Sequence, residues 1–316
     1  MLYGEGKYTY ELIDGWAKIP EEWTLDSVPG LFVDLDDRVY VFSRSDHPLT
    51  VFDRDGNLLT TWGEGLFSRP HGIYISPDGS VYCTDDGNHT ARKFTPDGKE
   101  LLSMGNKDQP SDTGYVNKGT MDERLASIKK AAPPFNCPTG IALSATGEIY
   151  VTDGYGNARV HKFSPDGTLL FSWGEPGTAP GQFRLPHHVW VDTKERVWIC
   201  DRANSRIQIF NDQGEFLTQW NDFNRASAVF IDKNEETVYV AERQLRLSIF
   251  TFDGKLLARL GSQGQDYLGK TGLSSITPHA IAVDSRGDIY IGEINHPEDG
   301  TARRGSRSLR KFVRKG

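Results

Sequence analysis

Three of the eight histidines in this 316-residue chain fall at corresponding positions of a repeated sequence unit. Six units are recognisable, and the same position in each is occupied in turn by Pro29, His71, Thr139, His187, Ser227 and His279. Histidine therefore occurs in every second unit. If the units surround a central axis, alternate units are related by about 120°, and three imidazoles at one level converge on a single point of that axis. This is the His₃ donor set of a zinc site that keeps a position open for water or substrate.

Zinc is the first expectation for this site, and other divalent transition metals that bind imidazole are alternatives. A single histidine of this kind is more often a hydrogen-bonded core residue, but three on alternate units indicate a shared ligand. His188 follows His187 directly, and strand alternation should point it away from the axis. The remaining histidines are interpreted as surface or loop residues: His47, His89, His161 and His296.

A second set of corresponding positions lies ten residues after the aligned residues Asp34, Ser76, Ser144, Asp192, Asp232 and Asp284, with a one-residue insertion allowed before Arg243. It is occupied by Arg44, Asp86, Gly154, Arg202, Arg243 and Ile294, and Tyr155 follows Gly154. Three arginines above a metal favour an anionic ligand, particularly a carboxylate held by two parallel hydrogen bonds. The alternative is that these arginines form structural ion pairs with nearby aspartates.

The repeated unit indicates what must position these side chains. Each unit contains four short alternating segments, and Pro-Asp-Gly stands at many of the turns between them. Asp-Gly favours a tight type I′ hairpin, in which both central residues have positive φ. Four antiparallel strands at a period near forty residues are typical of propeller blades. The sequence therefore predicts an all-β, six-bladed propeller forming one domain over 1–316, with blades near 29–64, 69–105, 137–174, 186–220, 226–261 and 278–313.

Three segments lie outside this repeat. The last unit lacks a fourth strand, and Tyr8–Ile13 (YTYELI) is predicted to complete that blade and close the ring. The insertion 106–136 has a helical composition over 121–131, with Thr120 as the N-cap and Pro133–Pro134 as the end. It is either a lid over the site or a disordered connector. A second charged excursion spans 294–307.

Composition excludes several classes of function. Charged residues make up 25% of the chain and the formal net charge is −7, with no basic patch of the kind that binds nucleic acid or an anionic membrane. Met1 to Lys7 shows no secretory signal pattern. The three cysteines, Cys83, Cys137 and Cys200, are expected to be inert core thiols. We therefore expect a cytoplasmic protein with a small anionic substrate, and the oligomeric state stays open.

The chain resembles NHL-repeat proteins, and more specifically the peptidyl-α-hydroxyglycine α-amidating lyases. The resemblance is carried by RPHG, TDGYGNARVHKFSPDGTLLFSWG, LPHHV, CDRANSRIQIF and TPHAIAVDSRGDIYIG, and extends more weakly over all six units. It implies that His71, His187 and His279 bind zinc. It also implies that Tyr155 is the catalytic tyrosine and that Arg44 and Arg202 are active-site arginines.

The lyase reaction splits a carbinolamide into an amide and glyoxylate. The metal polarises a substrate oxygen, a base removes the hydroxyl proton, and the C–N bond breaks. We assign the proton transfer to Tyr155. Arg243 and the insertion have no counterpart in the family pattern. Ala280 replaces the acidic calcium ligand that follows the third histidine, which argues against a calcium site, and Asn136 and Gly156 stand where secreted members have cysteines.

The leading interpretation is therefore a zinc-dependent C–N lyase acting on a small carboxylate-bearing, carbinolamide-like substrate. A zinc-dependent hydrolase or hydratase of a lactone, ester or amide would use the same site, because metal-bound hydroxide serves either reaction. A non-catalytic propeller that binds partners is the third alternative. The two enzymes would retain stoichiometric metal and lose it when the histidines are substituted. This result would separate them from the non-catalytic propeller.

Overall fold

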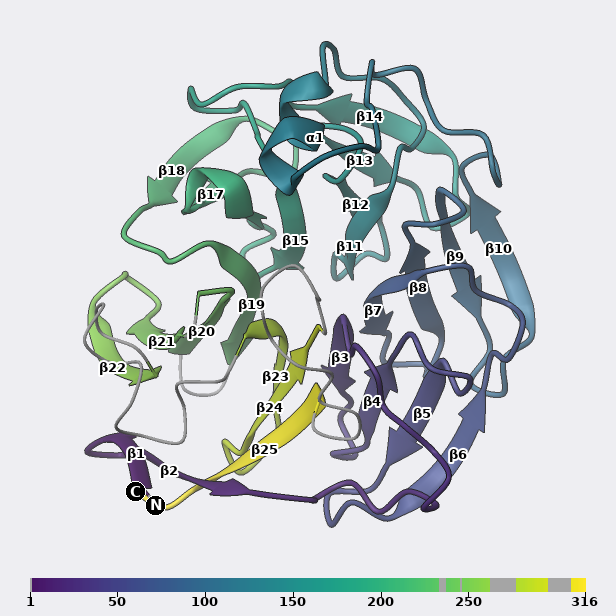
Figure 1. The fold of residues 1–316 in the computed structure, drawn as a ribbon. Helices are drawn as coiled ribbons and strands as arrows, with labels where there is room; N and C mark the ends of the chain where they lie inside the picture. Colours follow the sequence, from purple (N-terminus) through teal and green to yellow (C-terminus); the bar gives the residue numbers. More distant parts are fainter. Residues whose placement is uncertain (1, 233–236, 245, 262–276, 295–307) are drawn as a thin grey trace. The chain divides into compact units, whose positions relative to one another are not determined.

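The computed structural model describes residues 2–232, 237–244, 246–261, 277–294 and 308–316. The charged excursion at 294–307, apart from Ile294, and His296 lie outside the described residues. The fold class is the predicted six-bladed β-propeller, built from antiparallel sheets (Figure 1). The chain divides into two compact units, one of residues 66–226 and one of residues 1–65 with 227–316.

The unit of residues 66–226 contains three four-stranded sheets, each an up-and-down antiparallel meander in chain order. The first is β7 (Pro70–Ile75), β8 (Val81–Asp85), β9 (Thr90–Phe94) and β10 (Glu100–Met104). The second is β11 (Pro138–Leu143), β12 (Ile149–Asp153), β13 (Arg159–Phe163) and β14 (Leu169–Trp173). The third is β15 (Pro186–Val191), β16 (Val197–Asp201), β17 (Arg206–Phe210) and β18 (Phe216–Trp220).

The other unit contains two further meanders and one composite sheet. The meanders are β3 (Gly30–Val33), β4 (Val39–Phe42), β5 (Leu49–Phe52) and β6 (Leu58–Trp62), and β19 (Ala226–Asp232), β20 (Thr237–Glu242), β21 (Arg246–Thr251) and β22 (Leu256–Gly261). The composite sheet contains β23 (Pro278–Val283), β24 (Ile289–Glu293) and β25 (Leu309–Arg314).

The composite sheet is completed by the N-terminus, as the sequence predicted. Strand β2 (Tyr8–Ile13) pairs antiparallel with β25, matching Leu12 with Phe312. Strand β1 (Leu2–Glu5) then adds a fifth strand at the edge by pairing with β2. The sequence missed β1 because it is short and largely exposed and has no clear hydrophobic alternation.

Neighbouring sheets within a unit pack through their first strands and through apolar side chains of both faces. Strand β11 contacts both β7 and β15, and β23 contacts β3 and β20. In the unit of residues 66–226 one core cluster includes Tyr150 and Ile199, and another includes Tyr82 and Phe163. These clusters fix the first strands, which carry the candidate metal ligands.

The Pro-Asp-Gly turns differ from the expected type I′ geometry. In the turn between β7 and β8 Gly79 has a φ of 80°, whereas Asp78 is not among the residues with positive φ. The Gly79 amide donates to Ser76 O at 2.8 Å, and the Ser76 amide donates to Ser80 O at 3.0 Å. A four-residue turn that ends in one left-handed glycine therefore replaces the tight two-residue hairpin.

The predicted helix of the insertion is confirmed but is shorter than expected. Helix α1 spans Met121–Ser127, and Thr120 and Glu123 form a reciprocal capping box at its start. The helix ends at Ser127, before the expected residue 131. Ile128 leaves the helical conformation and is buried, so packing ends the helix before the prolines do.

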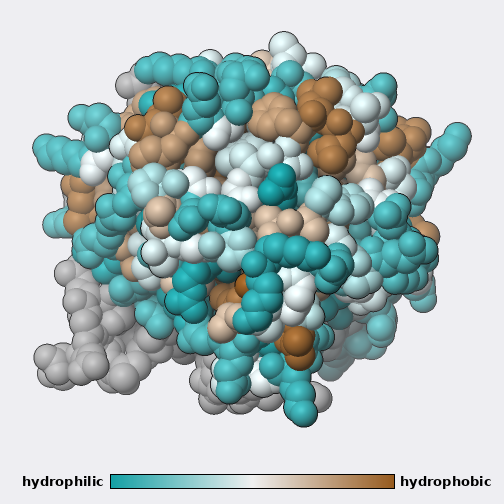
Figure 2. Space-filling model, turned by 90° about the horizontal axis from the view of Figure 1, so that it is seen from above, coloured by the Kyte–Doolittle hydropathy of each residue, from teal (hydrophilic) through white to brown (hydrophobic). Residues whose placement is uncertain are grey.

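Exposed hydrophobic side chains occur in small groups among hydrophilic ones, as Figure 2 shows for one face. Several lie on the fourth strands of the sheets: Leu59, Leu101, Leu170, Leu217 and Leu256. Scattered exposure of this kind is normal for proteins in water. None of the described helices combines the length and the apolar character needed to cross a bilayer.

Candidate functional site

A β-bulge marks the position of each candidate metal ligand. The pairing register of the first strand with its neighbour shifts across His71, His187 and His279, and also across Thr139. A bulge bends the strand and re-aims the side chain that it displaces. Simple alternation therefore cannot be counted through His187 to assign a direction to His188.

Backbone carbonyls hold two of the three imidazoles in a defined tautomer. Nδ1 of His71 lies 2.6 Å from Thr139 O, and Nδ1 of His279 lies 3.1 Å from Pro29 O. Because a carbonyl oxygen can only accept a hydrogen bond, Nδ1 carries the proton in both rings. Nε2 is then left with a free lone pair, which is the form in which histidine binds a metal.

The hydroxyl of Tyr155 lies between two of the histidines. It is 3.1 Å from Nε2 of His71 and 3.2 Å from Nε2 of His187. All three residues are buried. The hydroxyl has one proton and can donate to only one of the two nitrogens at a time. The structure thus brings the expected catalytic tyrosine into direct contact with two expected ligands.

His71, His187 and His279 are all buried, and each offers one imidazole nitrogen that could bind a metal ion. The ligand nitrogens of His71 and His187, which belong to the same unit, lie within 4.8 Å of one another. An all-imidazole donor set suits a divalent transition metal better than calcium, which prefers oxygen ligands. The residue types and tautomers therefore fit such an ion.

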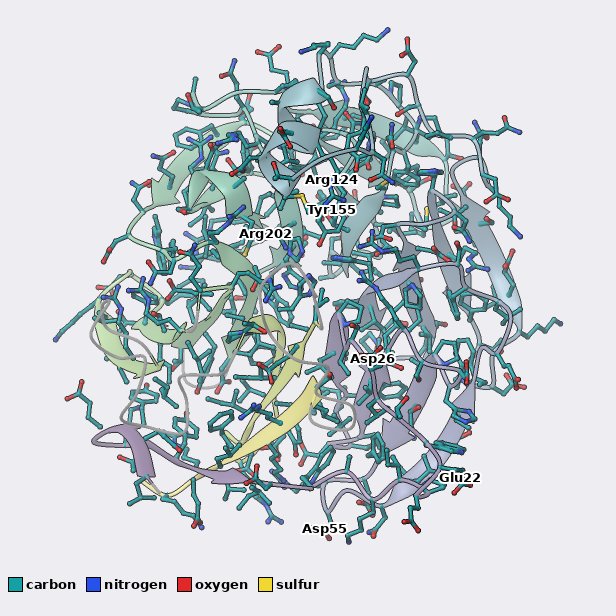
Figure 3. The ribbon with its side chains drawn as sticks, in the orientation of Figure 1. Glu22, Asp26, Asp55, Arg124, Tyr155 and Arg202 are labelled. Atoms are coloured by element: carbon teal, nitrogen blue, oxygen red, sulfur yellow. The ribbon has the colours of Figure 1, made fainter. Side chains whose placement is uncertain are left out.

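Arg202 contacts the same hydroxyl from the neighbouring sheet, where it directly follows β16. It opens the short 3₁₀ segment η1 (Arg202–Asn204), and its Nη1 donates to Tyr155 Oη at 3.4 Å. The guanidinium carbon stands 5.4 Å from the centre of the Tyr155 ring. Within the part of the chain that the structure describes, Arg202 has no ion pair, and its buried Nε has no hydrogen-bond partner. Figure 3 shows Arg202 and Tyr155 close together, with Arg124 of α1 nearby.

Arg69 is a site residue that the repeat comparison did not identify. Its guanidinium lies 5.8 Å from the centre of the Tyr155 ring and forms an ion pair of 3.2 Å with Asp86. Burial lowers the pKa of Arg69 while the facing Asp86 carboxylate raises it, and the net change is a rise. Its place in RPHG, two residues before His71, is the signal that could have indicated it.

Two glycines allow the chain to carry Tyr155 so close to its neighbours. A Cβ atom at Gly154 would lie 2.2 Å from Pro186 O, and one at Gly156 would lie 2.2 Å from Asn136 Oδ1. Neither glycine has a positive φ. The glycines are therefore required for close approach rather than for the sharp turn that the sequence suggested. Asn136 and Gly156 are in contact, and the Gly156 amide donates to Asn136 O at 2.9 Å.

The insertion packs directly on Tyr155. Leu125 and Ile128 of the insertion form one buried cluster with Tyr155 and Leu185, and Tyr115 packs against it. Thr113 Oγ1 also donates to Gly156 O at 2.6 Å. The segment is ordered against the tyrosine, as expected for a lid.

The other predicted site residues belong to the unit of residues 1–65 and 227–316, which is described separately. Arg44 is half-buried, and its amide donates to Ser27 O at 3.0 Å. Arg243 is half-buried and follows β20. Ala280 is buried in an apolar cluster with Val28 and Tyr290.

Two residue classes depart from the sequence interpretation. His161 is fully buried in β13 rather than lying on the surface, because it packs between strands of its own sheet. Cys83 and Cys200 are buried free thiols as expected, whereas Cys137 is only partly buried and packs beside the Tyr155 cluster. Burial raises the pKa of all three thiols, which keeps them protonated.

Comparisons with known proteins agree with this architecture. The NHL repeat family model matches residues 135–163. The chain is 31% identical to human NHL repeat-containing protein 3, over 97% of this chain and 85% of that protein. It is 28% identical to peptidyl-alpha-hydroxyglycine alpha-amidating lyase 1 of Drosophila melanogaster, over 76% of this chain and 45% of the relative. Virginiamycin B lyase from Staphylococcus aureus shares the fold, with a TM-score of 0.58 at 14% identity over 97% of this chain and 89% of that chain.

Proposed function

The chain belongs to the family of NHL repeat-containing protein 3, and from this premise we propose that it is a metal-dependent lyase that cleaves a carbinolamide carrying a carboxylate. The observation that carries the proposal is the position of the Tyr155 hydroxyl, which contacts His71, His187 and Arg202 together. Amidating lyases among the relatives favour this reaction over others that such a site could perform.

We propose that His71, His187 and His279 hold the metal, with zinc as the first expectation. The bound ion would act as a Lewis acid toward a substrate oxygen. Support comes from the burial of the three imidazoles and from the tautomers of His71 and His279, in which Nδ1 carries the proton and Nε2 can bind the ion.

The chain's own side chains supply binding and proton transfer. Arg202, a buried cation with no ion pair within the described part of the chain, would bind the substrate carboxylate. Arg44, and less centrally Arg243, are proposed to assist it. Tyr155, acting as the phenolate, would take the proton of the substrate hydroxyl at Oη and become the neutral phenol. As the C–O bond becomes a carbonyl, the C–N bond breaks, its electron pair moves to nitrogen, and Tyr155 returns the proton there. The products are an amide and glyoxylate.

The insertion would exclude water from this step. Leu125 and Ile128 cover Tyr155 with apolar surface, and closing such a surface over a site prevents competing hydrolysis. We further propose a cytoplasmic location, because the chain's three cysteines are free thiols.

The proposal is tested by metal analysis followed by turnover. We expect about one equivalent of zinc per chain, and release of glyoxylate from an N-acyl-α-hydroxyglycine. His71→Ala should lose both, while His47→Ala, which changes a histidine stacked on Trp23 in the other unit, should lose neither. Turnover of lactones or esters instead would assign the site to a hydrolase. Bound metal without turnover of any substrate would favour a binding scaffold.

A further inference from the structure

A buried acidic residue ends the second strand of five sheets and pairs with a basic residue of the third strand. In four of them the partner is an arginine: Asp85 with Arg92, Asp201 with Arg206, Glu242 with Arg246, and Glu293 with Arg310. Asp201 also accepts backbone N–H groups of the loop that leads into the first strand. The pair thus fastens that loop to the sheet.

The sheet that carries Tyr155 departs from this pattern. Its acid, Asp153, faces His161, with Nε2 at 3.6 Å from Oδ2, and both side chains are fully buried. Arg159 of the same strand is directed elsewhere, donating to the carbonyls of Gly174 and Ser172. In this sheet alone among the five, the partner of the buried acid is therefore an imidazole rather than a guanidinium group.

The hydrogen bonds of Asp153 do not by themselves compensate for the burial of its negative charge, so a neighbouring cation would stabilise it. Its Oδ2 accepts from the Asn136 amide and from Asn157 Nδ2, both at 2.8 Å. Its Oδ1 is buried with no hydrogen-bond partner in the described chain. A buried carboxylate is costly unless it is paired and hydrogen-bonded. Asp153 also interacts with His89, whose pKa is lowered by burial, and with the Cys137 thiol, whose pKa is raised by burial.

Asp153 holds both ends of the segment around Tyr155. Asn157, two residues after Tyr155, is bonded to Asp153 and also accepts from the Ala132 amide at the end of the insertion. The Gly156 amide donates to Asn136 O at 2.9 Å. Tyr155 therefore lies in a segment that contacts Asn136 and Asn157, and both of these residues are held by the Asp153 carboxylate.

We propose that His161 is a positioning residue for Tyr155. Its Nε2 lies 3.6 Å from Asp153 Oδ2 and its Nδ1 lies 2.8 Å from Ser172 Oγ, and this placement of the ring beside the carboxylate keeps residues 154–157 and the end of the insertion ordered. Loss of the imidazole leaves the carboxylate with the hydrogen bonds of Asn136 and Asn157 alone, and the loop becomes less ordered. Phe135 and Phe163 pack on the imidazole and add no charge.

Neighbouring sheets supply matched substitutions for the test. Arg92 and Gln208 stand at the same register position as His161, each two residues before the last phenylalanine of its strand. His161→Arg provides a permanent cation and His161→Gln a permanently neutral side chain, and the fold already accepts both at this position. Protection factors of backbone amides by hydrogen exchange, measured on the full chain between pH 5.5 and 8, report order without needing a substrate.

His161→Gln should lower the protection factors of residues 154–157 roughly tenfold relative to the wild type, the scale of a lost hydrogen bond to a charged group. His161→Arg should keep them high, and amides of β17 should be unaffected in all three proteins. Unchanged protection in His161→Gln would overturn the proposal, as would equal loss in both variants, which would indicate packing rather than charge.

The positioning role of His161 rests on the proposed function in one respect only, namely that Tyr155 is a catalytic residue. If the amides respond as expected but no carbinolamide is turned over, the positioning stands and the proposed reaction fails. If turnover is found and His161→Gln changes neither the amides nor the pH profile of kcat, the reaction stands and the positioning role fails.

Discussion

The hydroxyl of Tyr155 lies 3.1 Å from Nε2 of His71, so the expected proton carrier and an expected metal ligand are in direct contact. The tautomer of His71 is set from its other side by Thr139 O. The nitrogen that faces Tyr155 is therefore an acceptor, and the phenol proton can be directed toward it. Metal binding at this nitrogen would remove that acceptor and leave the hydroxyl to act on substrate.

Tyr155→Phe removes only this hydroxyl and keeps the ring that packs against Leu125 and Leu185. We expect the variant to fold and to retain metal while losing on the order of 10²-fold or more in kcat, the usual scale of acid–base catalysis. Glyoxylate release and metal content are measured on the same preparation. Near-wild-type kcat would transfer the base role to metal-bound hydroxide.

Arg202 and Arg206 are four residues apart and buried, but their surroundings predict opposite effects. Arg206 pairs with Asp201 at 2.9 Å and also bonds three loop carbonyls, whereas Arg202 faces Tyr155. Arg202→Lys should weaken turnover with little change in Tm, because the planar fork that grips a carboxylate is lost. Arg206→Lys should lower Tm, because it disrupts a structural network.

Kinetics and thermal unfolding of the two variants separate the roles. If Arg202→Lys reduced Tm as much as Arg206→Lys and left kcat/KM unchanged, Arg202 would be a structural residue. In that case the planar guanidinium group of Arg202 would make no contribution to kcat/KM.

The fold was predictable because its signals are local and repeated. The hydrophobic alternation and the turn residues recur in every unit, and even the closing strand at Tyr8–Ile13 has the predicted bounds. The corresponding positions of His71, His187 and His279 followed from the same repeat. The β-bulges at these histidines could not be predicted from the repeat, because they depend on strand pairing rather than on residue type.

Features specific to a single blade were the ones that sequence comparison missed. Arg69 acts through a contact with Tyr155 that crosses from one sheet to the next. His161 was placed on the surface because a lone histidine in an alternating segment has no distinguishing pattern. Its burial beside Asp153 is visible only once β12 and β13 are paired.

His89 should make stability depend on pH. Its Nδ1 accepts from the Cys137 amide at 3.0 Å, and burial lowers its pKa. The folded protein disfavours the protonated ring, so protons bind the unfolded chain more readily, and this contribution to stability is complete above the ordinary histidine pKa and is lost as the pH falls below it. His89→Asn keeps an acceptor and tolerates the φ of 62° at this position, but does not titrate.

We therefore expect the fall in Tm between pH 7.5 and pH 5 to be smaller in His89→Asn than in the wild type, by roughly 1–3 °C. Thermal unfolding followed by circular dichroism at both pH values measures it. An equal fall in the two proteins would show that His89 is not responsible for the acid sensitivity.

The insertion should stabilise the site mainly through the buried side chains of Leu125 and Ile128. Leu125 is 6% exposed and packs in one cluster with Ile128 and Tyr155. Leu125→Ala leaves a cavity beside the tyrosine and should lower the free energy of unfolding by about 2 kcal/mol, the lower end for deletion of a buried leucine, since the cluster is small. Turnover should fall further than stability predicts, because Tyr155 loses its packing surface.

Leu101→Ala, at a leucine that is 50% exposed in β10, is the matched control and should change neither stability nor turnover. Chemical denaturation, hydrogen exchange at residues 154–157 and kcat are compared for the three proteins. If Leu125→Ala lowers stability but leaves exchange at Tyr155 and kcat unchanged, the insertion is a structural cover and does not control the site.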